Sequence, residues 1–315
     1  MKVPNYLKRI LKVCFGFFLL WILFLKIPGK GVFESLLEAR LSFFLLALVM
    51  YLGGQVLSAY KWSVLAEPLG FKRPFLNFVS FYFIGMFFNL FMPGSIGGDL
   101  YRAALLAGLE KSRKRAAYSV LAERYTGGIA LLSFCALAVG IYFRSSLPPV
   151  LSTLIFTLLT IGWSFLLTLP VWERNFPWVQ KLARKLNLED FTIYWKHPTK
   201  LLWALILSFI FQFINIVTVV LLGMSIKINA PLLSYFFIVP IADLLSILPI
   251  SISGLGIREG GYVLMFKSLG VEASKGLACG LLALAITLIS GILGGIVYSL
   301  TSYPIVILRK KREGN

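Results

Sequence analysis

The sequence predicts an all-α fold, namely a polytopic helical membrane protein with about six transmembrane helices and two opposed re-entrant helical hairpins in an inverted repeat. The 315 residues are 58% hydrophobic and only 14% charged, with a mean hydropathy of +0.85. This composition excludes an ordinary soluble protein. Apolar stretches long enough to cross a hydrocarbon core of about 30 Å, roughly 20 residues as a helix, recur along the chain. Two of these stretches are interrupted at their centres by similar glycine-containing motifs.

Six apolar segments are continuous and predict ordinary spans. They lack the strict alternation of barrel strands, so helices are the spanning structure that satisfies their backbone. The segments are 13–27, 41–60, 119–143, 149–171, 201–223 and 277–302. The first follows basic residues as a signal peptide does, but it ends in KIPGKG without a small-residue cleavage site, so we expect an uncleaved helix.

The distribution of Lys and Arg orients these spans. If the N-terminus is cytoplasmic and each broken segment returns to its starting side, most of the 31 basic residues fall in cytoplasmic loops, with the loop at 61–73 among them. We therefore expect a multi-pass protein of the cell membrane with both termini in the cytoplasm. The polar connection 172–200 is expected at the cytoplasmic face, as an amphipathic interfacial helix or as a solvated linker. The net charge of +18 then reflects topology and lipid contact rather than nucleic acid.

The broken segments, 75–108 and 230–270, contain PGSIGGDLYR and PISISGLGIR. A shift of 156 residues superposes the two motifs, which share Pro, Ser, Ile, Gly and Arg, and it also aligns the flanking spans. Because the halves, about 1–145 and 146–315, have opposite predicted orientations, they form the inverted repeat of many transporters within one domain. Each broken segment is expected to be a re-entrant hairpin, with two complete short spans as the alternative.

The hairpin motifs also carry charged residues, which are costly inside a membrane and normally have partners there. Glycines let backbone N–H groups approach a ligand, the helix that follows presents a positive dipole end, and an arginine one to two turns into that helix can bind phosphate. The expected headgroup-binding residues are Ser95, Gly97, Gly98, Asp99, Arg102, Ser251, Ser253, Gly254, Gly256, Arg258 and Glu259. Supporting charges are expected from Glu123, Arg124 and Asp243, although an ion pair that only locks helix packing is the alternative for the first two.

Other chemistries find little support. The single histidine, His197, has no Cys or His at metal-ligand spacing, and it cannot complete a Ser-His-Asp set. No G-x-x-x-x-G-K-[ST] motif is present for nucleotide hydrolysis. The cysteines Cys14, Cys135 and Cys279 lie in apolar segments and are expected to pack in the core, and GILGG at 291–295 is expected to permit close helix packing. We expect no cofactor, no metal and no enzymatic activity.

Three stretches carry a family resemblance: NLFMPGSIGGDLYRA at 89–103, AERYTG at 122–127 and LPISISGLGIREGG at 248–261. Together they resemble the lysylphosphatidylglycerol synthase transmembrane-region family, the flippase-like domain of the bacterial multiple peptide resistance factor and of many stand-alone membrane proteins. The resemblance covers nearly the whole chain and adds Asn89 to the expected headgroup-binding residues. It implies a role in moving or presenting a lipid. Full-length synthases also carry an aminoacyl-transferase domain, and we expect this chain to be a stand-alone member without it.

The leading expectation is a flippase-like transporter of the cell inner membrane, in which Arg102 and Arg258 hold the phosphate of an anionic lipid. Asp99, Glu123 and Glu259 would orient these arginines or exchange a proton. One alternative is a membrane-embedded enzyme or accessory subunit acting on a lipid-linked sugar or phospholipid, with Asp99 as its carboxylate. Another is a structural protein whose hairpins only pack. The expected partner is a membrane phospholipid or lipid-linked substrate and not nucleic acid, and the oligomeric state stays open, with a homodimer as one alternative.

Overall fold

The computed structural model describes residues 21–92, 96–108, 112–143, 149–175, 192–247, 251 and 254–301. This part of the chain contains helices and turns and no strand, and five of its helices are long and apolar enough to cross a membrane. The five are α3 (Leu41–Ala66), α6 (Arg113–Ala138), α7 (Pro149–Asn175), α9 (Pro198–Ser225) and α12 (Ala273–Leu300). They confirm the all-α polytopic fold and match five of the six predicted spans. Most of the remaining one, 13–27, lies outside the described residues.

The two broken segments form pairs of short helices, α4 (Phe75–Asn89) with α5 (Ile96–Ala107) and α10 (Leu232–Ile247) with α11 (Ile257–Ser268). The longest of them, α10, has 16 residues and the shortest have 12. At about 1.5 Å per residue these helices rise roughly 18–24 Å, less than the 30 Å of a hydrocarbon core. A further short helix, α2 (Gly29–Leu37), precedes α3.

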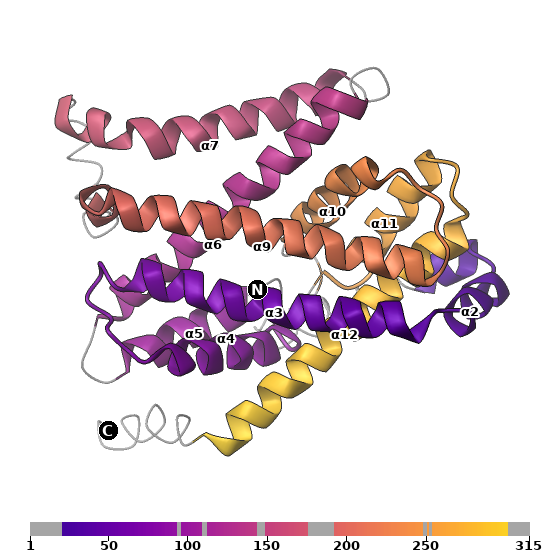
Figure 1. Cartoon of the computed structure of the whole chain (residues 1–315), viewed down its shortest axis with the longest axis horizontal. Coiled ribbons are helices and arrows are strands. Elements are labelled where there is room, and N and C mark those ends of the chain that lie inside the picture. Colours follow the sequence, from indigo (N-terminus) through magenta and orange to yellow (C-terminus); the bar gives the residue numbers. More distant parts are fainter. Residues whose placement is uncertain are drawn as a thin grey trace, which may run out of the picture.

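Helices α3 and α9, which correspond in the repeat, lie antiparallel along the middle of the molecule (Figure 1). At one end, the backbone N–H of Arg40 donates to the carbonyl oxygen of Ser225 at 3.0 Å. At the other end, Lys200 Nζ lies 2.6 Å from Glu67 Oε2. Helices α3 and α9 therefore run in opposite directions, which is the arrangement that the predicted inverted repeat requires.

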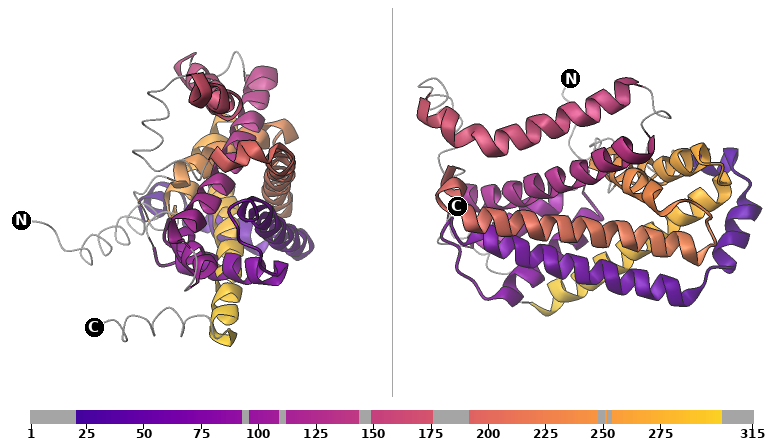
Figure 2. Two further views of the ribbon diagram at one scale, coloured as in Figure 1. Left: turned by 90° about the vertical axis from the view of Figure 1, so that its left-hand side faces the viewer. Right: turned by 45° about the horizontal axis from the view of Figure 1, so that its top comes forward.

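The two short-helix pairs lie toward opposite ends of this axis, α4 and α5 near the end of α3, and α10 and α11 near the end of α9 (Figures 1 and 2). Helix α12 packs against both pairs. Its glycines make this possible: a Cβ on Gly294 would meet the Phe83 carbonyl group of α4, and one on Gly280 would lie 3.0 Å from the Glu259 Cα of α11. The close packing predicted for GILGG is confirmed.

Each short-helix pair is surrounded by its own apolar core. One core includes Trp62, Phe78 and Leu106 in the first half, and the other includes Tyr262 and Phe266 in the second. Cys135 and Cys279 are free and buried, as predicted, whereas Cys14 lies outside the described residues.

One boundary prediction is wrong. The span predicted to end at residue 60 continues to Ala66, so Lys61 is not a cytoplasmic loop residue but a buried side chain of α3. The helix continues because WSVLA follows Lys61 and supplies another apolar turn. One positive charge thereby moves from the predicted loop into the protein interior.

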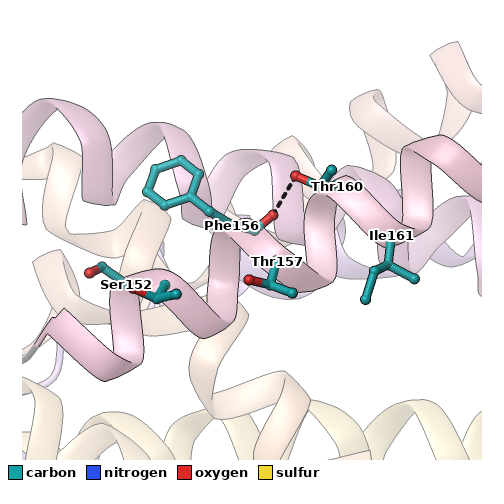
Figure 3. A pocket seen from close by; sticks show the side chains of 6 residues that line it. Ser152, Phe156, Thr157, Thr160 and Ile161 are labelled. Atoms are coloured by element: carbon teal, nitrogen blue, oxygen red, sulfur yellow. Dashed lines mark hydrogen bonds between the residues drawn. The ribbon is translucent and has the colours of Figure 1, made fainter.

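Helix α7 packs on α6 and lies at the edge of the bundle, where only 11% of its most apolar stretch of 18 residues is buried (Figures 1 and 2). A shallow hollow on α7 is lined by Ser152, Thr153, Phe156, Thr157, Thr160 and Ile161 (Figure 3). Thr160 Oγ1 donates to the Phe156 carbonyl oxygen at 2.8 Å, which satisfies the hydroxyl within the helix. None of the predicted site residues lines this hollow, because they lie in the two hairpins and on α6.

The predicted polar connection 172–200 is only partly described. Helix α7 continues to Asn175, and a short 3-10 helix, η3 (Thr192–Lys196), leads into α9. Within η3, Tyr194 donates its hydroxyl to the Leu65 carbonyl oxygen at 2.9 Å, and Trp195 Nε1 donates to that of Leu166 at 2.7 Å. These bonds fasten the end of the connection to α3 and α7. Residues 176–191, where the predicted interfacial helix or solvated linker would fall, lie outside the described residues.

Candidate site at the two hairpins

The first hairpin is closed by the predicted residues Asn89 and Gly98. The backbone N–H of Gly98 donates to Asn89 Oδ1 at 2.8 Å, so the end of α4 holds the first turn of α5. A Cβ on Gly98 would collide with the Gly85 carbonyl oxygen, which shows how closely the two helices approach. Gly97 lies against Met92, whereas the predicted Ser95 lies outside the described residues.

The charged residues of α3, α5 and α6 form one network. Arg102 Nη2 lies 2.8 Å from Glu123 Oε2, and Arg102 Nε lies 3.0 Å from Asp99 Oδ1. Arg124 Nε lies 2.9 Å from the other Asp99 oxygen, Oδ2. Lys61 Nζ approaches Glu123 Oε1 to 2.9 Å. The structure therefore brings together all four predicted charges of the first half and adds Lys61 to them.

Uncharged side chains complete this network. Ser58 Oγ donates to Glu123 Oε1 at 2.9 Å, and the Tyr82 hydroxyl donates to Ser58 Oγ at 3.0 Å. The Arg102 guanidinium carbon lies 4.9 Å from the ring centroid of Trp62 and 4.7 Å from that of Tyr82. Cation–π contacts of this kind favour a desolvated guanidinium. Arg102 is thus held rigidly, with only 2% of its surface exposed.

The network contains one more positive than negative charge. Lys61, Arg102 and Arg124 face two carboxylates, Asp99 and Glu123. Burying net charge is unfavourable unless a counter-charge is near. The Arg124 side chain is 44% exposed, so the excess positive charge has a route to the surface of the bundle.

The second hairpin contains a sharp turn at its glycines. Gly254 and Gly256 have φ values of 73° and 79°, in the left-handed region that favours glycine. Helix α11 begins only at Ile257, so Arg258 is its second residue. The expectation that this arginine lies one to two turns into its helix is wrong, because the left-handed turn delays the start of the helix. For Arg102, in the second turn of α5, the expectation is correct.

The N-terminus of α11 is capped from within. The backbone N–H of Gly256 donates to Glu259 Oε2 at 2.6 Å, and Arg258 Nη2 lies 3.5 Å from Glu259 Oε1. Arg258 Nη1 also donates to Thr287 Oγ1 of α12 at 3.2 Å. The predicted carboxylate Glu259 thus takes the place where the helix dipole favours an anion.

Four buried side-chain atoms in the described part of the chain have no hydrogen-bond partner, namely Arg102 Nη1, Arg258 Nε, Ser251 Oγ and Gln212 Oε1. The first three belong to predicted site residues and can donate a hydrogen bond. Such atoms are rare in protein interiors and ask for an explanation. The predicted Ser253 lies outside the described residues.

One side chain of α3 lies within electrostatic reach of both hairpins. The Tyr51 side chain interacts electrostatically with Arg258 and Asp243 of the second half and with Arg124 of the first. Asp243, on α10, accepts a hydrogen bond from Asn215 Nδ2 of α9 at 2.7 Å. The predicted residues therefore form two clusters, one at each hairpin, with Tyr51 between them.

Several residues of these clusters were not predicted from the sequence. The signal for Lys61 is its position between apolar residues on both sides, which is compatible with a longer span than the one predicted. The other contributors are uncharged residues of ordinary helical segments, for which a single sequence gives no signal: Tyr51, Ser58, Trp62, Tyr82, Asn215 and Thr287. Among the described residues, no group of three or more His, Cys, Asp or Glu side chains could hold a metal ion.

Comparison with protein families decides the relationship. The model of the lysylphosphatidylglycerol synthase TM region matches residues 9–295, which covers both hairpins and all five described spans except the last residues of α12. The chain belongs to this family. Membership of this family indicates a membrane- and lipid-related function. The match also confirms the resemblance found in the motifs. No curated protein matches the chain.

Proposed function

We propose that the chain is a flippase-like transporter that binds the phosphate of an anionic phospholipid at Arg102 and Arg258 and helps the lipid cross the inner membrane. The observation that carries this proposal is the set of buried donors without partners at both arginines and at Ser251. Leaving such a donor unpaired costs about 1–3 kcal/mol each. A phosphate offers several acceptor oxygens and a negative charge, which is what the donors lack.

Charge supports the same ligand. The cluster of the first hairpin has one positive charge in excess, which a phosphodiester, with one negative charge, would neutralise. Arg124 is the exposed member of this cluster and is suited to first contact with the headgroup. Leu100, which follows Asp99, and Leu121, three residues before Arg124, are 63% and 56% exposed and offer an apolar surface for the acyl chains.

The short helices support a crossing route. In this proposal α4–α5 and α10–α11 re-enter the membrane from opposite faces, with both chain termini in the cytoplasm, and the lipid headgroup passes between them. Irregular backbone at membrane depth is tolerated where it is buried in protein or lines a polar cavity. The carboxylates Asp99 and Glu259 pair with Arg102 and Arg258 until the lipid phosphate takes the place of these carboxylates.

The enzyme alternative receives less support. Asp99 accepts hydrogen bonds from Arg102 at 3.0 Å and from Arg124 at 2.9 and 3.1 Å, so both of its oxygens are already engaged by arginines in this conformation.

The experiment is a reconstitution of the purified protein in phosphatidylcholine vesicles that carry a trace of fluorescent phosphatidylglycerol. Quenching of the outer-leaflet label reports crossing, which we expect to be accelerated by the wild-type protein. Arg102→Gln and Arg258→Gln should each abolish the acceleration, whereas Arg113→Gln, an exposed charge at the start of α6, should not change it. The unfolding transition of the Arg102→Gln/Arg258→Gln double variant shows whether it is folded. Unchanged crossing in the folded double variant would sink the proposal.

A further inference from the structure

Asp243 differs from the other carboxylates of the two clusters. Asp99, Glu123 and Glu259 each make an ion pair with an arginine. In the described part of the chain Asp243 makes none, and its side chain accepts a hydrogen bond from the neutral amide of Asn215.

The groups around Asp243 come from every neighbouring helix. Helix α11 contributes Arg258 and Tyr262, α3 contributes Tyr51, and α9 contributes Asn215. Helix α6 meets α10 through Cys135, in an apolar cluster with Phe237. Arg258 is thus the cation that acts on Asp243, and it does so from beyond ion-pair distance.

A carboxylate in this position has two accessible states. Partial burial on the apolar helix α10 favours the neutral, protonated form, whereas the positive charge of Arg258 favours the ionised form. A phosphate bound at Arg258 would offset that positive charge and would place a negative charge nearby. Binding of the anion therefore promotes binding of a proton at Asp243, and by linkage the proton promotes binding of the anion.

We propose that Asp243 is a proton-binding site that couples the crossing of the lipid to the movement of one proton. This inference rests on the proposed lipid transport. A carboxylate oxygen of Asp243 takes up one proton from the aqueous phase when the phosphate binds at Arg258, and it releases that proton on the other side when the lipid leaves. A phosphodiester with one negative charge and one proton carry no net charge together. The lipid and the proton therefore cross together without work against the membrane potential.

The position of Asp243 on α10 suits such a cycle. Pro240, three residues earlier, lies inside the helix and cannot donate a backbone hydrogen bond to the Phe236 carbonyl oxygen. A helix weakened at this point can bend, and the bending can expose Asp243 first to one side of the membrane and then to the other. Asn215 holds the carboxylate in the present conformation at 2.7 Å.

The test uses the same vesicles with potassium and valinomycin to hold the membrane potential at zero and with a pH gradient of about one unit. Labelled phosphatidylglycerol should accumulate in the leaflet on the alkaline side, up to a ratio of about tenfold, which is the free energy of one proton over one pH unit. Asp243→Asn should still bind the lipid but show no accumulation. Asp243→Glu should restore part of it, and Glu272→Gln, an exposed carboxylate before α12, should behave as wild type.

A second measurement detects the proton itself. Infrared difference spectra on addition of short-chain phosphatidylglycerol should show a protonated carboxyl band in the wild type that is missing in Asp243→Asn. Persistence of the band in Asp243→Asn would overturn the assignment. Accelerated crossing that ignores the pH gradient, equal in wild type and Asp243→Asn, would overturn the coupling and leave the transport proposal intact. Absence of any crossing by the wild type would overturn both.

Discussion

Replacing Glu123 by Gln tests whether the ionic network of α3, α5 and α6 is balanced as its charges indicate. Glu123 accepts contacts from Lys61 at 2.9 Å and from Arg102 at 2.8 Å, and the exposed fractions of all three side chains are 5% or less. Removing its charge raises the net charge of the cluster from one to two positive charges. Breaking a buried pair in this way typically costs about 3–5 kcal/mol.

The companion variant is Glu123→Gln/Lys61→Met, which returns the cluster to one excess positive charge. We expect it to recover part of the lost stability, with a coupling free energy of about 0.5–3 kcal/mol in a double-mutant cycle. The free energy of unfolding is measured by titration with SDS in dodecyl maltoside, followed by tryptophan fluorescence. Glu67→Gln is the matched control, since its partner Lys200 is 40% exposed and the pair is worth about 0–1 kcal/mol. A double variant no more stable than Glu123→Gln would refute the charge count.

Three further changes test the packing and closure of the first hairpin. Gly98→Ala should destabilise the protein by about 1–3 kcal/mol, because its methyl group would collide with the Gly85 carbonyl oxygen, and the free energy of unfolding measures this. Asn89→Ala should cost about 1 kcal/mol by removing the acceptor for the Gly98 N–H, and hydrogen exchange at that amide should accelerate. Gly294→Ala should loosen α12 from α4 and lower the unfolding midpoint, whereas Gly53→Ala, with open space around it, should not lower it.

The spans and hairpins could be predicted because hydropathy and glycine-rich interruptions are local properties of the chain. The same reasoning gave Arg102 the carboxylates Asp99 and Glu123 as partners, since charges within apolar segments need partners. It could not say that Asp99 bridges two arginines, because the relative rotation of α5 and α6 depends on packing.

Two differences have distinct physical causes. Lys61 lies where an apolar segment of about 20 residues can end, and only the length of α3 shows that it is inside. Arg258 lies in the first turn of its helix because Gly254 and Gly256 adopt left-handed conformations, which a glycine permits but does not require. Uncharged residues such as Asn215 and Thr287 become recognisable only once their partners are located.

The proposed function depends on an anion-binding site formed by the two hairpin arginines. Native mass spectrometry of the purified protein measures this most directly, by comparing bound lipid in the wild type and in Arg102→Gln/Arg258→Gln. The account predicts an anionic phospholipid retained by the wild type and lost in the double variant, with Arg113→Gln unchanged. Equal retention of the same lipid in all three proteins would contradict it.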